Sequence, residues 1–143
     1  MAACTFFGHA ECYGLDDQAL RLTIEELIIG GVDTFYVGHQ GQFDSIVRSE
    51  LKSLQHAYPH IRYAVVLAYM PGQPTEYDDY SDTMLPEGIE AVHPRYAISW
   101  RNDWMLKQSD YVVTYVTHNW GGAAKYYQKA IKAGKKVINL HSQ

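Results

Sequence analysis

Short apolar runs recur along the chain, and each is continuous rather than alternating with polar residues. Continuous runs of β-branched and aromatic residues are typical of strands covered on both faces, as in parallel sheets. The pattern therefore predicts five buried strands: Cys4–Phe7, Thr34–Val37, Tyr63–Ala68, Tyr111–Val116 and Lys136–Leu140.

Helical spacing fills the intervals between these runs. Residues 16–31 place four apolar side chains at i, i+4, i+7 and i+8, namely Leu20, Ile24, Leu27 and Ile28. Asp16 or Asp17 is the expected cap of this helix, and further helices are predicted within residues 43–59, 99–110 and 121–136. Strands that alternate with helices indicate right-handed βαβ units. The predicted fold is a single α/β domain over residues 1–143: a Rossmann-like, open, mainly parallel five-stranded sheet with helices on both faces.

The interval between the third and fourth predicted strands breaks this alternation. It contains several prolines, and between Glu76 and Glu90 it has six acidic residues but no Lys or Arg. A long stretch without periodicity is more often a lid than a simple connection. We expect an acidic flap around residues 70–92, and the composition leaves open whether part of it is disordered.

Composition and charge narrow the function classes. The net charge of −4 provides no basic field for holding nucleic acid. No apolar run approaches the roughly 20 residues that span a bilayer, and Met1–Gly8 lacks the features of a signal peptide. The chain is therefore expected to be cytoplasmic. With 12 Tyr and 3 Trp among 143 residues, some aromatic rings are expected to line a recognition surface.

Glycines follow four consecutive predicted strands, and histidines accompany three of them. In an open α/β sheet, ligands bind beyond the carboxyl ends of the strands, where these turns lie. Glycine leaves backbone N–H groups accessible at a helix N-terminus, which is an anion-binding position. Two such turns, Gly38–Asp44 and Gly121–Ala123, are predicted to hold phosphate. The alternative for each is a tight turn that binds no ligand.

Other side chains near these turns have more than one interpretation. Asp44 and Glu11 are the candidate acid/base residues, although Asp44 is also suited to capping its own helix. Arg101 either clamps a phosphate or pairs with acid from the flap, and Trp120 either stacks on a base or seals the sheet edge. No metal is expected, because the histidines lack HxH or HExxH spacing. The predicted ligand contacts are Gly8, His9, Gly38, His39, Gln40, Gly41, Phe43, Asp44, Arg101, Asn102, His118, Asn119, Trp120, Gly121, Gly122 and Ala123.

Three stretches carry a family resemblance: TFFGHAE from Thr5, FYVGHQGQFDSIV from Phe35, and the C-terminal part from RNDWMLKQSDYVV at Arg101 to KKVINL. They resemble the YpsA-like branch of the SLOG superfamily, Rossmann-like proteins related to the LOG and DprA folds. The resemblance covers nearly the whole chain apart from the acidic segment. It implies binding of a nucleotide or of a nucleotide-derived molecule such as ADP-ribose, with no required cofactor. By analogy with related folds, a homo-oligomer is expected.

Two departures from the family pattern bear on the activity. LOG enzymes carry Pro-Gly-Gly-x-Gly-Thr-x-x-Glu at the fourth strand, whereas this chain has Ala124, Lys125 and Gln128 near the last three motif positions. This difference argues against LOG-type hydrolysis. YpsA-like sequences often have Gly-Gly-Ala after the second strand, whereas this one has Gly38-His39-Gln40. The difference implies a bulkier rim around the predicted ligand site. Three functions stay open: nucleotide binding, cleavage or transfer at a nucleoside N-glycosidic bond, and a protein-interaction module.

Overall fold

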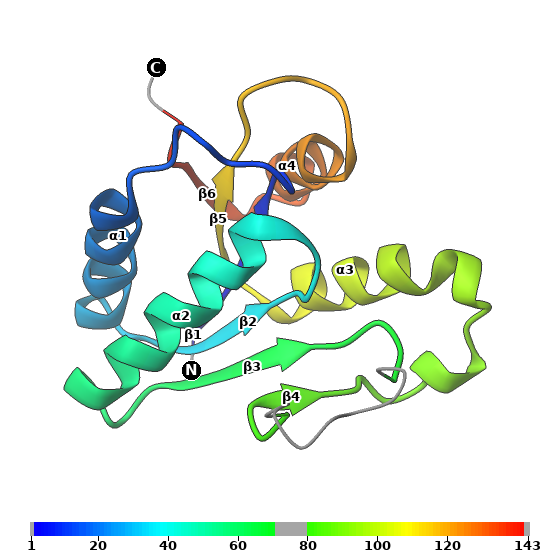
Figure 1. Ribbon diagram of the computed structural model, residues 1–143, viewed down its shortest axis with the longest axis horizontal. Coiled ribbons are helices and arrows are strands. Elements are labelled where there is room, and N and C mark those ends of the chain that lie inside the picture. Colours follow the sequence, from blue (N-terminus) through cyan, green and yellow to red (C-terminus); the bar gives the residue numbers. More distant parts are fainter. Residues whose placement is uncertain (1, 71–79, 142–143) are drawn as a thin grey trace.

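The computed structural model describes residues 2–70 and 80–141, and it has the α/β architecture that the sequence predicts (Figure 1). Its sheet is parallel throughout, with strand order β4-β3-β2-β1-β5-β6. The sheet is therefore open and six-stranded rather than five-stranded. The strands are β1 (Ala2–Gly8), β2 (Val32–Val37), β3 (Arg62–Val66), β4 (Thr83–Met84), β5 (Tyr111–Tyr115) and β6 (Lys136–Asn139).

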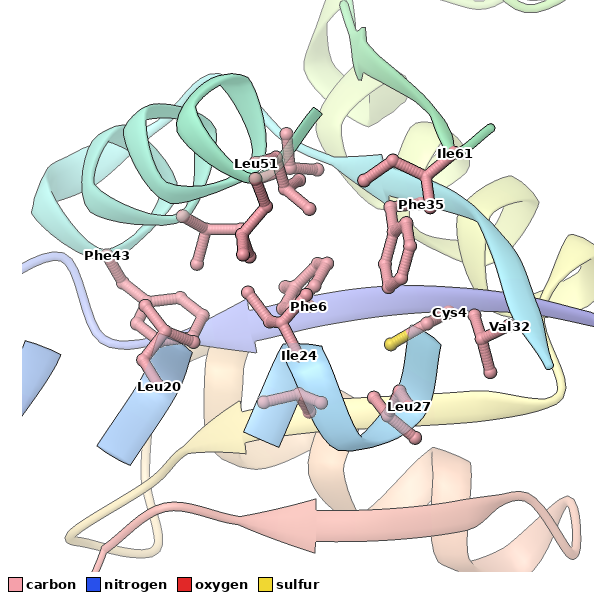
Figure 2. Close-up of a cluster of buried hydrophobic side chains, with 14 of the residues drawn as sticks. Cys4, Phe6, Leu20, Ile24, Leu27, Val32, Phe35, Phe43, Leu51 and Ile61 are labelled. Carbon is pink, nitrogen blue, oxygen red and sulfur yellow. The ribbon is translucent and has the colours of Figure 1, made fainter. Parts of the chain in front are cut away.

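Helices cover both faces of the sheet, as predicted. Helices α1 (Asp17–Ile29) and α2 (Gly41–Ala57) pack on one face, and α3 (Ala97–Gln108) and α4 (Gly122–Lys132) on the other. The alternation of side chains along β1 separates the two cores, because Phe6 belongs to the cluster under α1 and α2 whereas Phe7 belongs to the cluster under α3 and α4. Figure 2 shows the first cluster, where Leu20 and Ile24 of α1 meet Phe6.

The start of α1 follows the expected local chemistry, whereas no side chain of the described residues caps α2, α3 or α4. Asp16 is the cap of α1, since its Oδ1 accepts hydrogen bonds from the backbone N–H groups of Gln18 at 3.0 Å and Ala19 at 3.4 Å. Two short 3₁₀ turns, η1 (Ile89–Ala91) and η2 (Pro94–Tyr96), lead into α3. The central helices and strands therefore occupy the places that the hydrophobic pattern assigned to them.

The segment predicted to be an acidic flap is partly built into the sheet. Residues 71–79 lie outside the described part of the chain, but β4 pairs with β3 as the parallel edge strand. Asp82 fixes this strand: its carboxylate accepts hydrogen bonds from Arg48 Nε at 2.9 Å and from Tyr63 Oη at 2.9 Å. The prediction of a flap is therefore wrong for this part, because one of its acidic residues pairs with a cation of α2.

Candidate functional site

A cleft of about 700 Å³ opens at the carboxyl ends of the central strands. The end of β1 and the loop after it form one side, and the loop between β5 and α4 forms another. The starts of α2 and α4 and one face of α3 complete it. The sequence-predicted site residues that line this cleft are Gly8, His9, Glu11, Gln40, Asp44, Arg101, Asn102, His118, Trp120, Gly121, Gly122 and Ala123.

Five predicted ligand contacts lie elsewhere: Gly38, His39, Gly41, Phe43 and Asn119. Phe43 is fully buried in the core beneath α2, so its prediction as a ligand contact is corrected (Figure 2). His39 is exposed but does not line the cleft, and Asn119 lines a separate cavity of about 290 Å³. Only two of the three strand-end histidines therefore meet.

The glycine that ends β1, Gly8, and the glycine that follows β2, Gly38, make room for the protein's own side chains. A Cβ atom added to Gly8 would lie 2.2 Å from the Phe43 ring. One added to Gly38 would lie 2.7 Å from Asp44 Oδ2 and 3.1 Å from Arg101 Nη1. Contacts as short as 2.2 Å to a buried ring and 2.7 Å to a carboxylate oxygen essentially do not occur for a Cβ atom, so a side chain at either position would have to displace Phe43 or Asp44. These two glycines are thus explained without a ligand.

The turn before α2 is not the open phosphate seat that the sequence predicted. The backbone N–H of Gln40 donates to Asp44 Oδ2 at 3.0 Å, and that of Gln42 donates to the carbonyl oxygen of Ala10 at 2.8 Å. An anion placed here would also meet the carboxylate of Asp44. The prediction is corrected because the protein's own acceptors, the Asp44 carboxylate and the Ala10 carbonyl oxygen, already occupy two of the N–H groups that a phosphate would use.

Arg101 is likewise engaged within the protein. It is 2 % exposed, and its guanidinium donates from Nη1 to the Val66 carbonyl oxygen at 2.8 Å and from Nε to Asn102 Oδ1 at 2.8 Å. A third hydrogen bond, from Nη2 to Gln40 Oε1, measures 2.5 Å. The side chain therefore ties β3, α3 and the start of α2 together at the base of the cleft. Neither predicted role, a phosphate clamp or a partner of flap acid, describes this arrangement.

Asp44 is the titratable group most altered by its surroundings in the cleft. Burial raises its pKa to about 6, against the opposing effects of the Gln40 N–H and the positive charge of Arg101. Glu11, the other predicted acid/base residue, lies at the exposed rim of the same cleft. The two carboxyl groups therefore share a cleft but lie in different environments.

Three stacked rings form one wall of the cleft. The ring centroids of His9 and His118 lie 3.7 Å apart with planes inclined by 13°, and those of His118 and Trp120 lie 3.6 Å apart at 19°. His9 anchors the stack, because its Nε2 accepts a hydrogen bond from the backbone N–H of Thr117 at 3.0 Å. The proton of the neutral ring is therefore on Nδ1. Burial lowers the pKa of His9, with a smaller contribution from His118, so this ring is neutral near pH 7.

The N-terminus of α4 differs from that of α2. Gly121 precedes the helix at a φ of 92°, a conformation that favours glycine, and no side chain in the described part of the chain caps the first turn. Among the described residues, nothing lies within 4 Å of a Cβ placed on Gly121 or on Gly122. Both glycines line the cleft, so this helix end and its partial positive charge face open space.

Sequence reasoning missed several cleft residues. Tyr13 and Cys12 enter from the loop after β1, and Ile98 enters from the first turn of α3. No motif marks them, because their position depends on how that loop folds over the sheet edge. The stacking of His118 on Trp120 was also missed, although the His-x-Trp spacing after a strand is the signal that could have indicated it.

The fold and this cleft define a Rossmann-like α/β protein with a candidate site at the carboxyl edge of its sheet. Neither models of known protein families nor curated proteins match the sequence. Within residues 2–70 and 80–141, no group of three or more His, Cys, Asp or Glu is arranged to hold a metal ion. No helix in the same ranges combines the length and apolar character needed to cross a membrane.

Proposed function

We propose that the cleft binds a nucleotide or a nucleotide-derived ligand, with its phosphate at the N-terminus of α4. The observation that carries this proposal is the uncapped first turn of α4, which opens into the cleft at Gly121 and Gly122. Free backbone N–H groups and the helix dipole favour an anion at such a position. This differs from the sequence prediction in using one helix end rather than two.

The dimensions of the cleft also support a ligand of this class. Small-molecule sites occupy roughly 300–1,000 Å³, and the cleft of about 700 Å³ lies within that range. Beside the helix end it offers the aromatic surface of Trp120 and the polar groups of Asn102 and Gln40. A nucleoside attached to the phosphate would therefore meet both apolar and hydrogen-bonding groups.

Isothermal titration with AMP and ADP-ribose tests this proposal in the wild type and in Gly122→Asp. The new carboxylate would stand in the first turn of α4, where it competes with phosphate, so we expect affinity to fall at least about tenfold. Folding should be retained, because an acidic residue at a helix N-terminus is favourable. Gly122→Ala is the matched control, since its Cβ would enter open space. Equal affinity of Gly122→Asp and the wild type, or no binding of either ligand to the wild type, would refute the proposal.

A second candidate is cleavage or transfer at a nucleoside N-glycosidic bond. One observation favours it: the pKa of Asp44 is raised to about 6, so part of this group is protonated near neutral pH and suited to act as a general acid. Incubation with AMP should then release free adenine, detected by chromatography, at a rate that falls above about pH 6. Asp44→Asn should abolish release, whereas Glu11→Gln should preserve it if Asp44 alone is the acid. Absence of free base with the wild type would eliminate this candidate.

A further inference from the structure

Trp120 is held in place although most of its ring is exposed. It has a relative exposure of 66 %, yet one face lies against His118 at a centroid distance of 3.6 Å. His118 in turn lies against His9, which is 8 % exposed and hydrogen-bonded to the backbone of Thr117. The stack therefore extends from a buried anchor outwards to an indole ring at the cleft.

An exposed tryptophan with one supported face is suited to accept another planar ring. The two existing pairs have near-parallel planes, inclined by 13° and 19°, so a further planar ring can lie against Trp120 in the same way. A rigid platform loses little side-chain freedom on binding, because the His118 contact already restricts the ring. The remaining face of Trp120 can continue the stack by one more ring.

We infer that Trp120 is the residue by which the cleft discriminates among bases, with purines preferred over pyrimidines. The inference rests on the proposed nucleotide function and adds the chemical class of the base. A two-ring purine overlaps an indole over a larger area than a one-ring pyrimidine does, so stacking favours it. The phosphate contacts α4 and carries no information about the base, so the selectivity resides in the stack.

Four probes separate the base from the phosphate in isothermal titrations: AMP, UMP, adenosine and ribose 5-phosphate. The wild type is expected to bind AMP about tenfold more tightly than UMP. Trp120→Ala should weaken AMP binding about tenfold and bring AMP and UMP to similar affinity, while ribose 5-phosphate binding is unchanged. Because Trp120 is exposed, this variant is expected to fold. Trp120→Phe keeps an aromatic ring and should retain most of the preference.

Tryptophan fluorescence gives a second readout, which would not change on ligand binding if Trp120 had a purely structural role. Stacking of adenine on the indole should quench its emission, and Trp120→Phe should remove the quenching. Trp100→Phe is the matched control, because Trp100 is not among the residues that line the cleft. This variant should retain the quenching. Together, the two variants assign any quenching to one of the three tryptophans.

The outcomes distinguish this inference from the proposed function. If Trp120→Ala leaves the ratio of the affinities for AMP and UMP unchanged, the inference is overturned, whether or not ribose 5-phosphate binds at α4. If Trp120→Ala removes the preference for AMP over UMP while Gly122→Asp leaves the affinity for AMP unchanged, the inference holds and the phosphate seat fails. If none of the four probes binds to the wild type, both are overturned.

Discussion

Replacing Gly8 with alanine is expected to lower the free energy of unfolding by about 3 kcal/mol, as measured by urea denaturation. The new methyl group would lie 2.2, 2.3 and 2.7 Å from three atoms of the Phe43 ring. That ring is fully buried in the same core cluster as Leu20 and Phe6 (Figure 2), so moving it would disturb the packing around it. Either α2 moves away from β1 or the ring adopts a strained rotamer.

Two further variants show whether this steric contact is the cause. Gly122→Ala adds the same methyl group in open space and should change stability by less than about 0.5 kcal/mol. Phe43→Ala alone should destabilise by about 3 kcal/mol or more because it leaves a cavity. The double variant Gly8→Ala/Phe43→Ala should be more stable than the sum of the single effects predicts, by about 1 kcal/mol or more. Additive effects, or a stable Gly8→Ala protein, would contradict this account of Gly8.

The sequence allowed most of the fold to be predicted, because its strands are continuous apolar runs and its helices have a clear apolar face. The exception is β4, which has only two residues, Thr83 and Met84, and therefore no hydrophobic period. It pairs with β3 through its backbone, and the adjacent Asp82 contacts Arg48, which is 34 residues away in sequence. No local pattern encodes such a contact, so an acidic stretch without periodicity was interpreted as a flap.

The candidate site was only partly predictable, because one residue type serves two purposes. Glycine after a strand admits either a ligand or a neighbouring side chain, and the sequence does not say which. At Gly8 and Gly38 the space is filled by Phe43 and by Asp44 with Arg101, whereas at Gly122 it is open. Whether the space beside a glycine is filled or open depends on contacts between residues far apart in sequence, which no local pattern encodes.

Arg101 illustrates the same limit for polar residues. Its predicted position near the start of a helix suggested a phosphate clamp, but α3 begins four residues earlier, at Ala97. Its hydrogen bonds go to β3, to Gln40 just before α2, and to its own helix. A guanidinium has several donors in fixed directions, and its partners are set by the elements that surround it. The consequence for function is that Arg101 orders the base of the cleft around Asp44.

The pH dependence of stability should report directly on Asp44. Its pKa is raised from 3.8 to about 6 in the folded protein, so between these values the native state binds more protons than the unfolded state. The free energy of unfolding therefore falls as the pH rises from about 4 to about 6, by at most about 3 kcal/mol from this group, and then stays level. Above pH 6 the free energy of unfolding is lower because the ionised carboxylate is buried and cannot be hydrated as it is in the unfolded protein.

Asp44→Asn should remove the cost of burying this carboxylate and with it that part of the pH dependence. The asparagine is neutral, and its Oδ1 can still accept the hydrogen bond from the Gln40 N–H. In urea denaturation, the variant should match the wild type near pH 4 and exceed its stability by up to about 3 kcal/mol at pH 8. Glu11→Gln, at the exposed rim of the same cleft, is the charge-matched control and should keep the wild-type slope. If this account is right, Asp44→Asn is not less stable than the wild type at pH 8. A less stable variant would mean that the attraction between Arg101 and the ionised carboxylate outweighs the cost of burying it.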